Sequence, residues 1–88
     1  MREQRPAGIN RARYDILKST AEAVWIRDIG TDCRSVTNDA ERVVSEMFTE
    51  YGLGNRRLIY QDSDGNWDEL KHCGAEFQGF APARDMAP

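Results

Sequence analysis

The chain has 88 residues and a net charge of −3, with 40% hydrophobic and 31% charged residues. Typical domains run to about 100–150 residues, so this length predicts one small domain and excludes α/β barrels and doubly wound sheets. No apolar run approaches the roughly 20 residues of a membrane span, and none follows the first arginines as it would in a secretory signal. We therefore expect a cytoplasmic globular protein with no membrane partner.

The charge is divided unevenly along the chain. Residues 1–13 carry a net charge of +3, whereas residues 14–88 carry −6. Residues 1–12 show no hydrophobic periodicity and predict a flexible basic arm. The candidate binding arginines at this end are Arg2, Arg5, Arg11 and Arg13. An acidic body repels phosphate backbones, which makes nucleic acid a less favoured partner than protein.

Two short strands are predicted before the first helical pattern. Residues 13–19 form a short segment with three apolar residues, Tyr14, Ile16 and Leu17. Residues 23–29 are rich in β-branched and aromatic residues, and residues 19–22 supply the turn between the two strands. Side chains alternate across a strand, so the second run sorts into Val24 and Ile26 on one face, and Trp25 and Ile29 on the other. Neither face is expected to be fully solvated.

The clearest pattern is a helix that begins near Ala40 and ends at Gly52. Thr37 or Asn38 can cap its free N–H groups, and Gly52 can adopt the left-handed conformation that ends many helices. The apolar residues recur with the period of one helical face: Ala40, Val43, Val44, Met47, Phe48 and Tyr51.

A β-hairpin is predicted around the sequence DSDGN, and a last strand over residues 77–81. Two hairpin registers fit: a two-residue turn sets Ile59 opposite Leu70, whereas a three-residue loop with Gly65 left-handed sets Leu58 opposite Leu70. We favour the second register. It sorts the large side chains into Leu58, Tyr60 and Leu70 on one face, and Ile59 and Trp67 on the other.

The element order strand–strand–helix–strand–strand–strand predicts an α+β fold. We expect an antiparallel sheet of four to five strands with one amphipathic helix on one face, a two-layer sandwich over residues 13–81, and a flexible tail over residues 82–88. One helix covers one face only, so the other face needs a cover from the N-terminal arm, a second subunit or a partner. The candidate interaction face consists of Trp25, Ile29, Ile59 and Trp67.

No catalytic, cofactor-binding or metal-binding site is predicted. His72 and Cys73 are neighbours on a predicted strand and point to opposite faces, so they do not form a dyad. With no disulfide framework in the sequence, Cys33 and Cys73 are expected to be free thiols. The DSDGN turn has the acidic spacing of a calcium loop, but it lacks the glycine and glutamate that such a loop requires. Its carboxylates form instead a candidate acidic hairpin: Asp62, Asp64, Asp68 and Glu69.

Three stretches carry a resemblance: SVTNDAERVV over residues 35–44, NRRLIYQDSDGNWDEL over residues 55–70, and EFQGFAP over residues 76–82. With its TNDAE-type helix start, RRLIY-type strand, D-S-x-G turn and closing G-F-A-P, the chain resembles small proteins of unknown function from bacterial phages, plasmids and other mobile elements. The resemblance covers about residues 24–82. It implies a bacterial cytoplasmic accessory protein, and it implies no activity or catalytic residue.

The leading functional hypothesis is a non-enzymatic module that binds a host protein or associates with itself, as a homodimer or larger homo-oligomer. One alternative is a small nucleic-acid-binding protein that uses the basic arm, with Tyr60 and Trp67 as stacking platforms. Another alternative is a small ligand-binding or enzymatic homodimer, whose pocket forms between subunits.

Overall fold

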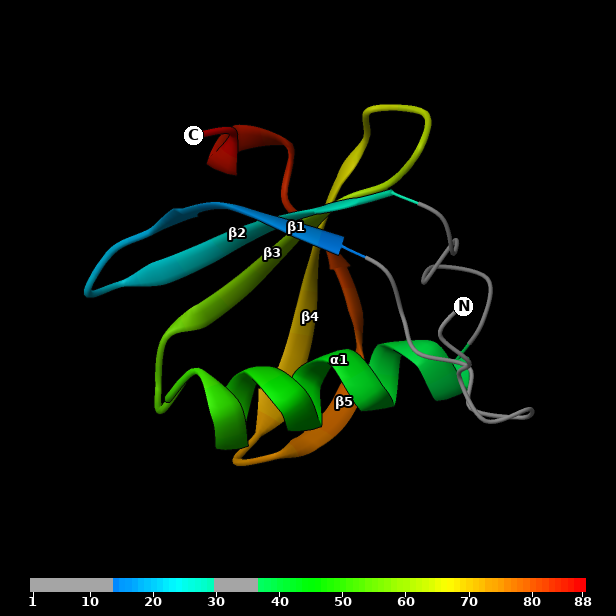
Figure 1. Ribbon diagram of the computed structural model, residues 1–88. Coiled ribbons are helices and arrows are strands. Elements are labelled where there is room, and N and C mark those ends of the chain that lie inside the picture. The colour runs from blue at the N-terminus through cyan, green and yellow to red at the C-terminus, as the bar shows by residue number, and fades with distance from the viewer. Residues whose placement is uncertain (1–13, 30–36) are drawn as a thin grey trace, which may run out of the picture.

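The computed structural model describes residues 14–29 and 37–88. The elements follow in the order β1 (Tyr14–Ser19), β2 (Ala23–Asp28), α1 (Thr37–Glu50), β3 (Arg57–Gln61), β4 (Trp67–Cys73), β5 (Glu76–Pro82) and the 3₁₀ helix η1 (Arg84–Met86) (Figure 1). The strands form one five-stranded sheet in the order β1-β2-β3-β4-β5. The described residues therefore form a small α+β domain with a mostly antiparallel sheet and one α-helix, as predicted.

The prediction of a purely antiparallel sheet is wrong at one place, the pairing of β2 with β3. These two strands run parallel, whereas the β1–β2, β3–β4 and β4–β5 pairs are antiparallel. After β2 the chain passes through α1 before it enters β3. A helical crossover of this kind returns the chain to the end of the sheet where β2 began, so that β3 runs in the same direction.

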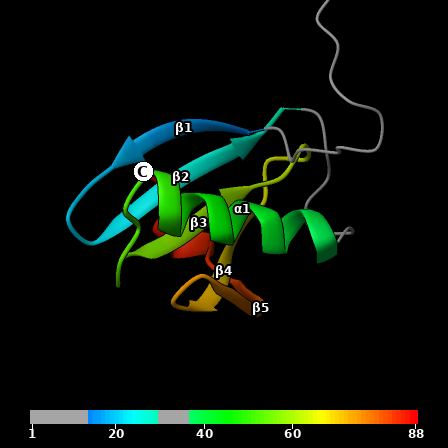
Figure 2. The ribbon, with the colours of Figure 1, turned by 60° about the horizontal axis from the view of Figure 1, so that its bottom comes forward.

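The helix lies on one side of the sheet (Figure 2). It packs most closely over β4 and β5. Its apolar face joins the side chains of β2, β3 and β4 that point the same way. We call this cluster the helix-side core: Val24, Ile26, Ala40, Val43, Val44, Met47, Leu53, Leu58, Tyr60 and Leu70. The predicted helical face is confirmed up to Phe48, which packs against this core.

The helix ends one residue earlier than its apolar pattern suggested. Its last residue is Glu50, and Tyr51, predicted on the buried face, is 49% exposed. Gly52 has a φ of +66°, which confirms its predicted left-handed conformation. The side chains of the predicted caps, Thr37 and Asn38, lie outside the described residues.

Arg56 fastens the end of α1 to the turn between β1 and β2. The last carbonyl groups of a helix have no partner within the helix. The Arg56 guanidinium donates to three carbonyl groups that follow the helix and to two oxygens at the turn. The acceptors are the carbonyl oxygens of Tyr51, Gly52, Leu53 and Thr20 and the hydroxyl oxygen of Ser19, at 2.8–3.3 Å.

The β3–β4 hairpin has the register that we favoured. Ile59 pairs with Glu69, and Tyr60 pairs with Asp68. The same register, extended by one pair, places Leu58 opposite Leu70. Gly65 has a φ of +90°, and its N–H donates to the carbonyl oxygen of Asp62 at 3.0 Å. A left-handed residue at this point is what the three-residue loop requires.

The other face of the sheet is covered by the end of the same chain. Beyond β5, Ala83 is buried and η1 lies on the opposite side of the sheet from α1 (Figure 1). We call this cluster the tail-side core: Ala23, Trp25, Ile59 and Ala83, with Trp67 and Met86 packed against them. Where a tail with little to bury was expected, residues 83–86 contact the sheet. The predicted two-layer sandwich is therefore only part of the architecture.

Candidate functional site

The outer edge of β1 exposes large apolar side chains. Among the described residues, the exposed large hydrophobic side chains are Ile16 (43% exposed), Leu17 (38%), Ile29 (47%) and Tyr51. Ile16 and Leu17 lie next to each other on β1, and five of the six residues of this strand are exposed. We call residues 15–18 the β1 edge.

The position of α1 explains why this edge is exposed. Ile16 pairs with Ile26, so both side chains face the side of the sheet on which α1 lies. Ile26 is fully buried, but Ile16 is one strand farther from β4 and β5, over which the helix packs. Among the described strands, β1 pairs with β2 only, so its other edge carries backbone groups that no described strand pairs with.

Charged groups flank the two apolar residues of the β1 edge. Asp15 lies opposite Arg27, and its Oδ2 is 3.7 Å from the Arg27 Nη2. Lys18 lies opposite Trp25, and its Nζ is 5.1 Å from the centre of the Trp25 ring. Both charged side chains therefore lie on the face of the tail-side core, one on each side of Ile16 and Leu17.

Three of the four residues of the predicted interaction face lie together in the structure, and residues 83–86 cover them. Trp25, Ile59 and Trp67 belong to the tail-side core, where Trp25 is 8% exposed and Ile59 is fully buried. The Trp25 indole N–H donates to the carbonyl oxygen of Met86, which holds the cover in place. Ile29 stands apart and exposed after the end of β2. The expected cover from the arm, a subunit or a partner is thus supplied by residues 83–86.

The predicted acidic hairpin is not an open acidic surface. Asp62 is buried, and its Oδ1 accepts hydrogen bonds from the N–H groups of Asp64 (3.0 Å) and Asn66 (2.9 Å). Asp68 is half-buried, and Asp64 is exposed at the turn. The Glu69 carboxylate accepts two hydrogen bonds from one guanidinium, described next. At least two of the four carboxylates therefore hold the hairpin together.

Glu69 forms a two-point ion pair with Arg57 across the β3–β4 pair. The Arg57 Nη2 and Nε donate to its two carboxylate oxygens at 2.7 and 3.2 Å. These hydrogen bonds lower the pKa of Glu69 below its ordinary value of 4.5, although partial burial acts in the opposite direction. The same contact raises the pKa of Arg57. The folded state therefore favours the charged form of Glu69.

The Glu69–Arg57 pair predicts a pH-dependent contribution to stability. Because the pKa of Glu69 is lower in the folded chain, the contribution is complete well above pH 4.5 and is lost as the pH falls through the lower folded value. We expect Glu69→Gln to lower the free energy of unfolding at pH 7 by at most about 1 kcal/mol, since water screens a partly exposed pair. Urea unfolding from pH 7 to pH 3 measures the difference, which should shrink at acid pH. An equal difference at both ends, or an equal effect of Glu76→Gln at the exposed Glu76, would contradict this role.

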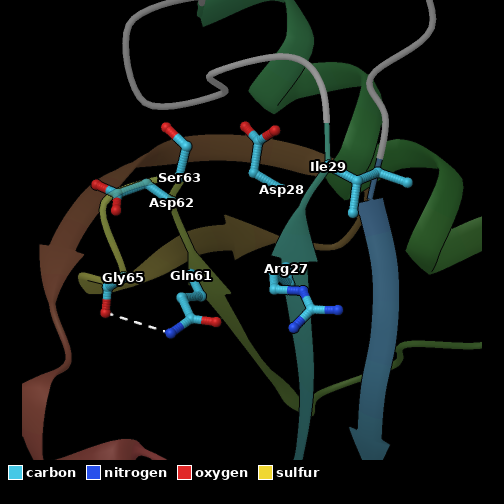
Figure 3. A pocket seen from close by; sticks show the side chains of 7 residues that line it. All are labelled: Arg27, Asp28, Ile29, Gln61, Asp62, Ser63 and Gly65. Carbon is cyan, nitrogen blue, oxygen red and sulfur yellow. Dashed lines mark hydrogen bonds between the residues drawn. The ribbon is translucent and has the colours of Figure 1, made fainter.

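A shallow polar hollow lies where the parallel strands β2 and β3 end (Figure 3). Seven residues line it: Arg27, Asp28, Ile29, Gln61, Asp62, Ser63 and Gly65. Asp28 is buried and accepts a hydrogen bond from the Tyr60 hydroxyl at 2.6 Å, while Asp62 accepts the two turn N–H groups. Asp28 and Arg27 point to different sides, as strand neighbours do (Figure 3). The carboxylates of this hollow are thus engaged in the fold.

His72 and Cys73, which were tested as a catalytic pair in the sequence, have separate surroundings. Both ring nitrogens of His72 face backbone carbonyl oxygens, Nε2 that of Arg56 (2.9 Å) and Nδ1 that of Gly74 (3.0 Å), and Cys73 is an exposed free thiol. The described residues hold no group of three or more His, Cys, Asp or Glu that could bind a metal ion. Among these residues, no helix is both long and apolar enough to cross a membrane. Cys33 and the arginines of the basic arm lie outside them: Arg2, Arg5, Arg11 and Arg13.

The stacking platform expected for nucleic acid is not formed. Tyr60 is 1% exposed in the helix-side core, and its hydroxyl is held by Asp28. Trp67 is half-buried against the tail-side core on the other face. A base needs an open aromatic ring to stack on, and two rings on opposite faces do not make one platform.

Sequence reasoning missed the β1 edge as a candidate site. In the sequence, Ile16 and Leu17 look like ordinary strand residues. Their exposure depends on where α1 packs on the sheet, which the local sequence indicates only weakly. Comparisons of the chain with protein-family models, curated proteins and solved structures found no match.

Proposed function

We propose that this domain is a non-enzymatic protein-binding module that binds its partner by adding a strand to the β1 edge. The observation that carries the proposal is the pair of adjacent exposed aliphatic side chains, Ile16 and Leu17, on a strand at the end of the sheet. An exposed apolar edge strand is a template for another strand.

Strand addition uses two kinds of contact. Unpaired backbone groups along the edge supply hydrogen bonds to the incoming strand, and alternate side chains supply specificity. No described strand pairs with the outer backbone groups of the β1 edge. Its side chains add apolar contacts from Ile16 and Leu17 and one charge of each sign from Asp15 and Lys18. The polar hollow is consistent with a binding role, because Asp28 and Asp62, its two carboxylates, accept hydrogen bonds within the fold.

The resemblance to small proteins of phages, plasmids and other mobile elements supports an accessory role in a bacterial cytoplasm. The exposed aliphatic side chains of the β1 edge favour protein as the partner class.

Site-specific photocrosslinking tests this function. A benzophenone amino acid replaces Leu17 in the full chain, which is expressed in the native host and irradiated. We expect a covalent product of defined mass, because the partner strand lies within reach of position 17. The matched control carries the same group at Glu50, which is exposed at the end of α1 on another part of the surface. A product from both positions, or from neither, would overturn the proposal.

A further inference from the structure

We infer that the strand added to the β1 edge is β1 of a second copy of this chain, antiparallel, with Asp15 of each copy opposite the partner's Lys18. This inference rests on the proposed function and names its partner. The result is a twofold dimer with one continuous sheet across both copies.

The chemistry of β1 is self-complementary in this register. When two copies of the strand Tyr14–Ser19 are aligned antiparallel, an acidic residue lies opposite a basic one, and an aliphatic residue lies opposite an aliphatic one. Asp15 lies opposite the partner's Lys18, and position 16 lies opposite position 17 at the twofold axis. Opposite charges that face each other across an antiparallel pair stabilise it, and like charges destabilise it. Twofold symmetry produces each contact twice.

The bulge in β1 makes this register geometrically possible. In a regular strand, residues three apart point to opposite faces, so positions 15 and 18 would not meet across a twofold pair. Here the register shifts between Ile16 and Lys18, so Asp15 lies opposite Arg27 while Lys18 lies opposite Trp25. These partners are alternate residues of β2 and share a face. Asp15 and Lys18 therefore share that face too, as their contacts with Arg27 and Trp25 confirm.

The described elements around the β1 edge leave room for a second copy. A twofold axis perpendicular to the sheet keeps the same face of both copies on the same side, so each helix lies on one side and each η1 on the other. Among the described strands, the helix packs most closely over β4 and β5, and β1 lies at the other end of the strand order. Ile16 and Leu17, each more than a third exposed in the single chain, then lie against the partner at the axis.

Charge reversal tests the register. Asp15→Lys leaves two basic residues on the edge, and Lys18→Asp leaves two acidic ones. Each variant alone meets like charges at both contacts. We expect sedimentation equilibrium to show dimers for the unaltered chain and about a tenfold or greater weakening for each variant, less at 0.5 M salt than at 0.05 M salt. A 1:1 mixture of the two variants should dimerise again, because each basic edge then meets an acidic one.

Controls separate this inference from the binding function. Glu50→Lys reverses a charge on α1 and should leave dimerisation unchanged, and circular dichroism with thermal unfolding checks that all variants are folded. A mixture that stays monomeric while both variants are folded overturns the register. A monomeric unaltered chain whose position 17 cross-links to a different polypeptide overturns self-pairing and leaves the binding function in place. No cross-link at all overturns both.

Discussion

Trp25→Ala is expected to lower the free energy of unfolding by about 3–5 kcal/mol, the range measured for large aromatic residues removed from cores. Trp25 is 8% exposed and packs against Ile59 and Ala83 in the tail-side core. Its indole N–H also donates to the carbonyl oxygen of Met86, so the substitution removes the contact that holds residues 83–86 on the sheet. Urea unfolding measures the loss, and hydrogen exchange should show faster exchange at Met86.

Trp25→Phe is the matched control for this prediction. Phenylalanine keeps most of the apolar ring and cannot donate to Met86, so its cost should be nearer to about 1 kcal/mol, the usual net value of one hydrogen bond. If Trp25→Ala costs as little as Trp25→Phe and exchange at Met86 is unchanged, residues 83–86 do not cover the sheet in the way described.

Arg56→Met is expected to cost about 2–3 kcal/mol, because it removes the five hydrogen bonds that the guanidinium donates to the residues after α1 and to the β1–β2 turn. A hydrogen bond from a charged donor contributes more than a neutral one, and the carbonyl groups after the helix are left with water at best. In a domain whose total stability is of the order of 5–15 kcal/mol, this is a large share. Urea or thermal unfolding gives the value.

Two comparisons make the Arg56 prediction specific. Arg56→Lys keeps the charge but lacks the planar fork of donors, so it should recover only a minor part of the loss. Arg57→Met, at the next position, removes the pair with Glu69 and should cost at most about 1 kcal/mol. Equal costs for Arg56→Met and Arg57→Met, or full recovery with lysine, would mean that Arg56 contributes only its charge.

The β1 edge and the core make different contributions, although Lys18 contacts the Trp25 ring. Substitutions at Trp25 and Arg56 act on the stability of the fold, whereas Asp15 and Lys18 are exposed on β1 and should change association with little effect on unfolding. Loss of association together with stability in the Asp15 and Lys18 variants would instead mean that β1 needs these charges to fold.

Local patterns were sufficient to predict α1 and the five strands of this protein. The periodic apolar residues from Ala40 to Phe48 predict α1, because a helical period survives whatever the helix packs on. The β3–β4 register followed from Gly65 and from the sorting of Leu58 and Ile59 to different faces, since a slip by one residue would exchange the two faces.

Only the tertiary structure decided which surfaces are covered. The direction of β3 beside β2 depends on the path through α1, and the exposure of Ile16 depends on the helix docking over β4 and β5. Met86 reaches Trp25 across 61 positions of sequence, a contact that no local pattern encodes. Periodicity and turn chemistry are properties of neighbouring residues, whereas burial is set by segments that are distant along the chain. The sequence therefore placed the strands and the helix, and packing among the described residues left Ile16 and Leu17 exposed on β1.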